Sequence, residues 1–548
     1  MDKIYWADKI AKEVKERISK DPEVKGIVKK HGVLVYDEKT PSGEIHIGSG
    51  RGFIIHDIIT KVLKDLGLKP RFELSSDDMD PMDKPIRELP EYNQYLGVPF
   101  RNIPSPVKGY KSYAEYYFKQ ATDKFKDYGI DVKLETTGGN YDKGIFNDAI
   151  KKILDNHDKV KAIFERTYDK PYEKISFNPI CEKCGKIGTT VSYAWDKKRE
   201  VVKYKCEPNA VKWAVGCGYE GEVSPYNGTG KLPWKLEWAA KWPSKNVVVE
   251  FAGKDHFAAN GSRDIAVMVC KEVLDYTPPY PSSRTEVGQG YEFFNIQGKK
   301  MSTSKGLGVG FAKMAERIPP KILRFIIAKT KPRSVIDFDP EREHDILLLY
   351  DKYDTDERIY YGVDKVSKDE KRVISRVYEL AQIGKIRKTI PPQISLRHAS
   401  LIAQLSSDNE ECIRLLQKSD HIKSKISKAD NEYLIERLNS ARLWLKEFAH
   451  DKYKFTLQDV VSFKVKEILT PKQIDSVRLL VKKLESKKYT NDSLFEEFYT
   501  ICTESGMKNT EFFETCYQVL IGKNQGPKLA TLILSAGVDR IIKILKQI

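Results

Sequence analysis

The 548-residue sequence has no long hydrophobic run. Its apolar stretches fall short of the ~18 residues that a membrane-spanning helix requires. Residues 1–17 are charged and amphipathic, without the apolar core of a signal peptide. Only eight cysteines are present, too few for a disulfide framework in a chain of this length. These absences predict a cytoplasmic protein that does not cross a membrane and does not depend on disulfides.

The charge balance and the composition indicate a large, basic, globular protein. Lys and Arg number 94 against 78 Asp and Glu, which gives a formal net charge of +16. An excess of this size favours a polyanionic partner, nucleic acid before membrane, although an ordinary basic protein is an alternative. With 40% hydrophobic residues the chain can bury large cores, and its length predicts several domains.

Strand patterns are confined to the N-terminal part of the chain, where they alternate with helical patterns. This alternation predicts an α/β fold, a parallel sheet wound in the Rossmann-like manner, whose ligands bind beyond the carboxyl ends of the strands. From Pro319 onward strand patterns vanish, and charged amphipathic patterns predict one or two all-α domains. The expected strands are residues 32–36, 70–74 and 246–252, and the expected helices are residues 4–19, 47–66, 112–128, 144–156 and 262–275.

A glycine-rich turn, Thr40-Pro-Ser-Gly-Glu-Ile-His-Ile-Gly-Ser-Gly50, joins the first expected strand to the helix at 47–66. A strand, a glycine turn and a helix together present backbone N–H groups and a positive helix end to a phosphate. Such turns also serve packing alone, so the motif by itself does not decide between the two roles.

Two later segments carry polar groups that suit a nucleotide. Gly253-Lys-Asp-His256 follows the strand expected at 246–252, and an Asp at that place either binds ribose hydroxyls or caps the next helix. The loop Gly298-Lys-Lys-Met-Ser-Thr-Ser-Lys-Gly306 offers lysines and hydroxyls to phosphate oxygens, or is simply solvated. Its spacing is not that of a Walker A motif.

Four of the eight cysteines cluster within one short segment. Cys181 and Cys184 form a Cys-x-x-Cys-Gly knuckle, and Cys206 and Cys217 follow. Four thiolates complete a tetrahedral set, so the cluster predicts a closed, structural zinc site. The alternative is a group of buried free thiols.

Three tryptophans, Trp234, Trp238 and Trp242, recur at a spacing of four residues. Indoles at helical spacing form one packed face of a core or the apolar wall of a ligand pocket. The acidic loop 76–84 after the second expected strand either binds a cation or an ammonium group, or is solvated.

The glycine turn and the lysine loop together resemble the two signatures of class I aminoacyl-tRNA synthetases. Pro41-Ser-Gly-x-x-His-Ile-Gly48 is similar to the first signature, and Lys300-Met-Ser-Thr-Ser-Lys305 is similar to the second. Within that class the chain most resembles the class I lysyl-tRNA synthetases, over nearly its whole length. The segments that carry this closer resemblance are Trp6-Ala-Asp8, the insert Cys181–Cys217, Gly216-Cys-Gly-x-x-Gly221, Trp234–Trp242, Gly253-Lys-Asp-His256, Tyr291-Glu-Phe-Phe294 and Thr330–Pro340.

The resemblance implies a fold and an activity. A Rossmann catalytic domain carries a zinc-bearing insertion and is followed by an all-α anticodon-binding region. ATP, carried with Mg²⁺, and lysine would give lysyl-adenylate, and the lysyl group would pass to the 2′-hydroxyl of the terminal adenosine of lysine tRNA. We expect a monomer. The alternatives are a glutamyl-type class I synthetase and a non-catalytic tRNA-binding relative.

The expected boundaries and site residues follow from the family's motifs. The two halves of the catalytic domain are residues 1–100 and 231–318, with the insertion at 101–230, a stem-contact helical segment at 319–390 and the anticodon-binding region at 391–548. The expected catalytic residues are His46 and Lys300. The expected ATP-binding residues are Ser42, Gly43, His46, Gly48, Gly253, Asp255, Lys300, Ser302 and Ser304; the lysine-binding residues are Thr40, Trp234, Trp238, His256 and Tyr291; and the zinc ligands are Cys181, Cys184, Cys206 and Cys217.

The chain departs from the family pattern around both signatures. Asp37-Glu-Lys39 precedes Thr40, where relatives tend to have a small glycine-containing stretch, and Ser49 stands where many relatives have a second histidine. Thr303 takes the place of the middle lysine of the second signature. The carboxylate that pairs with the ε-ammonium of the substrate stays open; Glu38, Asp78 and Asp80 are the candidates.

Overall fold

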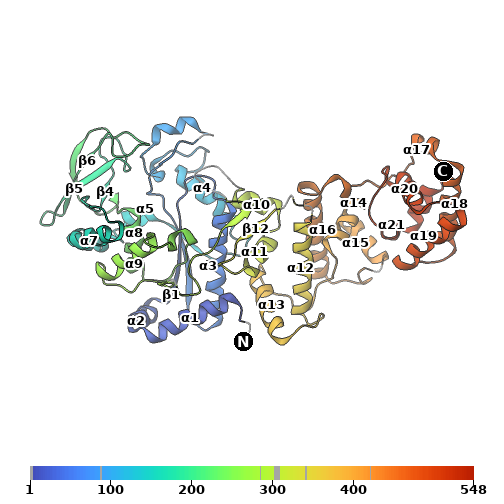
Figure 1. The fold of residues 1–548 in the computed structure, drawn as a ribbon, viewed down its shortest axis with the longest axis horizontal. Coiled ribbons are helices and arrows are strands. Elements are labelled where there is room, and N and C mark those ends of the chain that lie inside the picture. Colours follow the sequence, from blue (N-terminus) through green and yellow to red (C-terminus); the bar gives the residue numbers. More distant parts are fainter. Residues whose placement is uncertain are drawn as a thin grey trace. The chain divides into compact units, whose positions relative to one another are not determined.

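The computed structural model of the chain describes residues 4–86, 89–283, 285–300, 309–339, 342, 344–419 and 421–548 (Figure 1). Of Lys299 and Lys300 it describes only the backbone. The chain divides into two compact units. Unit 1 comprises Met1–Glu316, Leu323–Phe338 and Val366–Lys385, and unit 2 comprises Arg317–Ile322, Asp339–Lys365 and Ile386–Ile548.

The centre of unit 1 is a four-stranded parallel sheet with the strand order β3-β2-β1-β9. Its strands are β1 (Val33–Lys39), β2 (Pro70–Ser76), β3 (Lys133–Thr136) and β9 (Val247–Val249). Because Val33 pairs with Pro70 and Lys39 pairs with Ser76, the carboxyl ends of β1 and β2 lie at the same edge of the sheet. The predicted α/β fold with a parallel sheet is confirmed.

Helices cover both faces of this sheet. Successive side chains of a strand point to opposite faces, so neighbouring residues of β1 contact different helices. Asp37 faces α3 (Ile47–Asp65), whereas Tyr36 and Glu38 face α8 (Trp234–Lys245). The other helices up to residue 381 are α1 (Trp6–Lys20), α2 (Pro22–His31), α4 (Tyr113–Thr122), α5 (Thr137–Asp142), α6 (Asn147–Asp155), α7 (His157–Tyr168), α9 (Ser262–Glu272), α10 (Phe311–Arg317), α11 (Pro320–Lys329), α12 (Asp345–Tyr360) and α13 (Lys368–Ala381), with 3-10 turns at Pro90–Tyr95, Phe100–Asn102 and Lys254–Phe257.

Three smaller sheets belong to the same unit. The antiparallel sheet β5-β6-β7 consists of Thr190–Asp196, Val201–Cys206 and Glu220–Val223, and β4 (Asn178–Pro179) pairs with β8 (Gly230–Lys231). The third has the order β11-β10-β12, with β10 at Phe294–Ile296, β11 at Lys299–Lys300 and β12 at Ile336–Phe338.

Several predicted elements differ from the observed ones. The prediction that strands end before Pro319 is wrong for β12, which pairs in parallel with β10. The helix expected at 112–128 ends at Thr122, and the strand expected at 246–252 is regular only over β9. The strand β3 was not predicted, because its four residues contain no apolar run and three of them are exposed.

Unit 2 is helical beyond α12. Its other helices are α14 (Leu396–Leu405), α15 (Asn409–Lys418), α16 (Lys428–Glu447), α17 (Phe463–Ile468), α18 (Pro471–Ser486), α19 (Asn491–Ser505), α20 (Asn509–Ile521), α21 (Leu529–Ala536) and α22 (Val538–Leu545). The buried guanidinium of Arg437 on α16 forms two hydrogen bonds with Asp354 on α12, at 2.5 and 3.1 Å. Among the described residues of the whole chain, no helix combines the length and the apolar character needed to span a membrane.

Candidate active site

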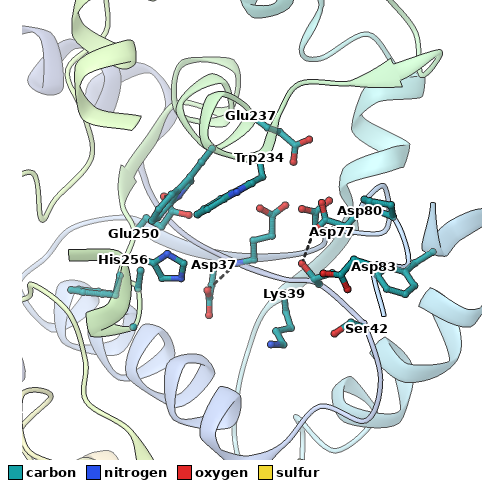
Figure 2. Close-up of a pocket in the computed structure, with 18 of the residues that line it drawn as sticks. Asp37, Lys39, Ser42, Asp77, Asp80, Asp83, Trp234, Glu237, Glu250 and His256 are labelled. Atoms are coloured by element: carbon teal, nitrogen blue, oxygen red, sulfur yellow. Dashed lines mark hydrogen bonds between the residues drawn. The ribbon is translucent and has the colours of Figure 1, made fainter. Parts of the chain in front are cut away.

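The carboxyl ends of β1 and β9 open onto a cavity of about 580 Å³ (Figure 2). This is where ligands of open parallel sheets bind. Its walls come from the residues that follow β1 and β2, from the first turns of α8, and from the segments after β9. The lining residues are Asp37, Glu38, Lys39, Thr40, Ser42, Asp77, Asp80, Pro81, Asp83, Lys84, Phe100, Trp213, Trp234, Glu237, Trp238, Glu250, Phe251, Ala252, Gly253, His256 and Tyr291.

All five residues expected to bind the amino acid line this cavity: Thr40, Trp234, Trp238, His256 and Tyr291. The rings of Trp234 and Trp238 stack with centroids 6.3 Å apart, and the His256 ring stands edge-on to both, at 6.0 and 5.3 Å. The Trp238 indole N–H donates to Glu250 at 2.8 Å, which fixes the ring. The tryptophans at helical spacing therefore form both core and pocket wall, with Trp242 fully buried below.

The residues expected to bind ATP are distributed around the same sheet edge. Ser42 and Gly253 line the cavity, while Gly43, Gly48 and Asp255 lie outside its lining. His46 caps α3, accepting the N–H of Ser49 at 3.3 Å on its Nδ1. Burial, with a smaller contribution from the charge of Lys39, lowers the pKa of His46 to about 4. The ring is therefore neutral at physiological pH.

The second signature falls largely outside the described residues. The backbone of Lys300 belongs to β11, but its side chain and the whole of Ser302 and Ser304 are not among the parts that the structure describes.

A buried ion network lies along the α8 side of the cavity. Lys231 Nζ lies 2.6 Å from Asp80, 3.1 Å from Glu237 and 3.3 Å from Asp77. Lys241 on α8 pairs with Glu237 of the preceding turn, at 2.5 Å, and with Glu38 on β1. Both lysines are almost fully buried. Burial alone would lower their pKa, but the surrounding carboxylates hold the pKa of both ammonium groups well above the ordinary value.

The three candidate carboxylates lie in different surroundings. Glu38 and Asp80 already have lysine partners, and Asp80 also accepts the hydroxyl of Thr40 at 2.9 Å. Asp78 lies outside the cavity lining, where it accepts the backbone N–H of Gly138. Sequence reasoning missed Lys231 and Lys241, because nothing local distinguishes these lysines from solvated ones.

Asp37 is a further carboxylate at the cavity that sequence reasoning did not select. Its Oδ2 lies 3.2 Å from Nδ1 of His56, and its Oδ1 accepts the N–H of Glu38 at 2.9 Å. Nε2 of His56 accepts the backbone N–H of Phe251 at 3.0 Å, which places the ring proton on Nδ1. Burial lowers the pKa of His56 to about 4 and raises the pKa of Asp37 to about 7. Asp37 thus faces the cavity opposite a neutral ring.

The four clustered cysteines converge at one point in unit 1, where Cys206 ends β6. Their sulfur atoms all lie within 4.8 Å of one another, with Cys181–Cys217 at 3.6 Å and Cys184–Cys206 at 3.7 Å. Tetrahedral zinc with Zn–S bonds of about 2.3 Å requires sulfur separations of about 3.8 Å. The knuckle closes through the N–H of Gly185, which donates to the carbonyl of Cys181 at 2.8 Å. The donor set therefore fits a zinc ion.

Comparisons with known proteins show the family of the chain. The family model of class I tRNA synthetases (K) matches residues 4–384, and an anticodon binding domain matches residues 417–548. The lysine–tRNA ligase of Methanocaldococcus jannaschii is 32% identical over 557 residues, covering 98% of this chain and 99% of the relative. Lysine–tRNA ligases of Picrophilus torridus (33% over 514 residues; 92% and 94% covered) and Treponema pallidum (31% over 560 residues; 99% and 98%) are similar. The chain belongs to the class I lysyl-tRNA synthetases.

Proposed function

We propose that the cavity activates lysine with ATP and that the lysyl group then passes to the 2′-hydroxyl of the terminal adenosine of lysine tRNA. The observation that carries this is the convergence of all five predicted amino-acid residues with the first-signature turn at one sheet edge. The lysine–tRNA ligase relatives, which span nearly the whole chain, support it.

In this reaction the protein positions the substrates and stabilises charge, and it forms no covalent bond to them. A carboxylate oxygen of lysine attacks the α-phosphorus of ATP, and pyrophosphate leaves in line. Gly43, His46 and Gly48 at the start of α3 would hold the phosphates and ribose, and Asp255 would accept ribose hydroxyls. Lys300, with Ser302 and Ser304, would stabilise the departing phosphates. Mg²⁺ would enter with the nucleotide and neutralise phosphate charge.

The charge of the cavity favours a cationic amino acid over glutamate. Seven lining residues are carboxylates (Asp37, Glu38, Asp77, Asp80, Asp83, Glu237 and Glu250) against two lysines (Lys39 and Lys84). Five of the carboxylates pair with Lys231, Lys241 or Arg263 behind the wall, and Asp37 and Asp83 stand outside these pairs. The indoles of Trp234 and Trp238 add faces suited to an ammonium group or its alkyl chain. Among the described side chains, only the His56 ring lies within ion-pair distance of Asp37, and that ring is neutral. We therefore assign Asp37 to an ammonium group of the substrate.

Measuring ATP–pyrophosphate exchange with each amino acid, with and without tRNA, tests this function. We expect exchange with lysine and not with glutamate. Lysine tRNA is added in parallel, so that an activation step that depends on tRNA is also detected. Exchange with glutamate, or the absence of lysine-dependent exchange in the presence of lysine tRNA, would contradict the proposal.

The cysteine cluster would hold a structural zinc ion, with Cys181, Cys184, Cys206 and Cys217 as its four ligands. The fit of the sulfur separations supports this, and a set filled by four thiolates leaves no position for substrate. Burial raises the pKa of Cys184 to about 12, so bound zinc would be needed to keep that thiol ionised.

Replacing Cys184 with serine is expected to remove one equivalent of zinc per chain, because a four-thiolate site loses affinity when one thiolate is lost. Elemental analysis of the purified protein measures the zinc content. Cys270→Ala is the matched control, since Cys270 lies in the core outside the cluster. A wild-type chain that binds no zinc, or a Cys270→Ala chain that loses it, would contradict the assignment.

Unit 2 would bind the tRNA, which also accounts for the basic charge of the chain. A cavity of about 590 Å³ lies between α14, the end of α16 and the segment before α21. Its wall holds Trp444 and Tyr453, and Arg397, Lys452 and Lys528 also line it. Aromatic faces beside cations suit unstacked bases and their phosphates. We further propose that the enzyme works in the cytoplasm, where its tRNA substrate is, and as a monomer.

A further inference from the structure

Lys39 carries its positive charge into the substrate cavity. It is the last residue of β1 and lines the cavity beside Thr40 and Ser42. Its Nζ atom makes no hydrogen bond or ion pair with any residue in the described ranges, in contrast to the buried Lys231 and Lys241. It also belongs to the Asp37–Lys39 stretch in which this chain departs from the family pattern.

Successive side chains of β1 point to opposite faces of the sheet, and this fixes the face on which Lys39 lies. Glu38 points to the α8 face, where Lys241 neutralises it. Lys39 and Asp37 point to the opposite face, on which Asp37 contacts His56 of α3. In Figure 2 the Lys39 side chain lies on the other side of β1 from Asp77, Asp80 and Glu237.

The charge of Lys39 acts on groups of both expected substrate subsites. Burial lowers the pKa of Lys39, and the nearby charge of Asp37 opposes this only in part. After the effect of burial, the charge of Lys39 contributes to the lowered pKa of both His46 and His256. His46 belongs to the nucleotide signature and His256 to the amino-acid wall. A partly desolvated ammonium that pairs with none of the described side chains is stabilised by an anion that enters beside it.

We propose that Lys39 is a catalytic residue of the activation step, whose ammonium binds a non-bridging oxygen of the α-phosphate of ATP. The role rests on the proposed function. In the step, a lysine carboxylate oxygen forms a bond to the α-phosphorus while the bond from that phosphorus to the β-bridging oxygen breaks. The bonding electrons leave with pyrophosphate, and Lys39 keeps its proton throughout.

The α-phosphate is a better target for this cation than the lysine carboxylate. The carboxylate gives up its negative charge as the new oxygen–phosphorus bond forms, so a cation held there would stabilise the ground state more than the transition state. The non-bridging oxygens of the α-phosphate remain charged during the reaction, and a fixed ammonium beside them lowers the barrier.

Replacing Lys39 with methionine tests the role because it removes the charge and keeps the length. We expect the single-turnover rate of lysyl-adenylate formation, followed with α-labelled ATP in the presence of tRNA, to fall about 30-fold. The KM values for lysine and ATP should change less than about threefold, and transfer from preformed lysyl-adenylate should persist. Lys39→Arg, which keeps the charge, should recover most of the rate.

Lys64→Met is the control, because Lys64 is exposed on α3 and the substitution changes the net charge equally. Should Lys39→Met fail to fold, Lys39→Ala is measured with and without added ethylammonium. We expect the amine to raise the rate of adenylate formation by this variant at least about fivefold. A rate within about threefold of wild type, or a raised KM for lysine with an unchanged rate, would overturn the role of Lys39 alone. A wild-type chain without lysine-dependent activation would contradict the proposed function itself.

Discussion

Replacing Lys241 with methionine is expected to lower the free energy of unfolding of unit 1 by about 3–5 kcal/mol. Removing one partner of a buried ion pair leaves an uncompensated charge in the interior, and losses of this size are typical. Lys241 is completely buried, and it neutralises Glu237 and Glu38, which are themselves close to Asp77 and Asp80. Lys231 would still lie beside Asp77, Asp80 and Glu237, whereas Glu38 would lose the ammonium group that it pairs with.

The loss of stability of the Lys241→Met variant should depend on pH in a defined direction. Burial, and after it the charges of Asp77 and Glu237, raise the pKa of Glu38 to about 8 although Lys241 lowers it, and without Lys241 the pKa would rise further. Glu38 is then protonated below about pH 8 in both folded proteins, and only above that pH does the variant keep a proton that wild type has released. The stability deficit of the variant therefore grows as the pH rises above about 8. Thr40 should also lose its fixed position, since its hydroxyl donates to Asp80 within the same network.

Urea unfolding followed by tryptophan fluorescence measures this effect, since six of the seven tryptophans, all but Trp444, lie in unit 1. Lys9→Met is the control within unit 1, because Lys9 is exposed on α1 and its loss should change the stability by less than about 0.5 kcal/mol. The double variant Glu237→Gln with Lys241→Met should regain part of the loss, as it removes one unpaired charge. An equal stability of Lys241→Met and wild type would show that the pair is not buried as observed.

The sequence was sufficient where the signal is local. The apolar run before Thr40 predicts β1, and the glycine turn with the helical pattern after it predicts α3 to within one residue at its end. Strand β3 and strand β12 were missed because each is short and held by pairing with distant strands and not by its own composition. The amino-acid pocket was predictable only through the family motifs, which select types of residue at fixed positions.

The charge pattern of the pocket could not be predicted from the sequence, because it depends on ion pairs between residues that are far apart in the chain. Lys241 and Glu38 are separated by 203 residues, and Lys231 and Asp80 by 151. From the sequence, Glu38 and Asp80 look like free carboxylates near the first signature, whereas the fold brings a buried lysine to each. The same pairing leaves Asp37 facing the cavity, although the sequence offers no reason to prefer it over its neighbours.

Replacing Asp37 with asparagine is expected to raise the KM for lysine about 100-fold while the KM for ATP changes little. Asparagine keeps the size and an acceptor for the N–H of Glu38, but it removes the negative charge that we assign to a substrate ammonium. A hydrogen bond between charged groups in a partly buried site contributes about 1.5–3 kcal/mol, which corresponds to this range of affinity. Asp158→Asn, which changes an exposed carboxylate on α7, should leave both constants unchanged.

The pH dependence of lysine binding separates this charge effect from a mere change of shape. Burial raises the pKa of Asp37 to about 7, so in the empty site the carboxyl group is mostly protonated at pH 6 and mostly ionised at pH 8. Because only the ionised form attracts the ammonium, the affinity for lysine should rise about tenfold over that interval and then level off. Calorimetric titration at pH 6.5 in buffers of different ionisation enthalpy should show proton release on binding, and Asp37→Asn should abolish both the release and the slope. A slope that persists in the asparagine variant would assign the titration, and the ammonium contact, to another carboxylate of the cavity.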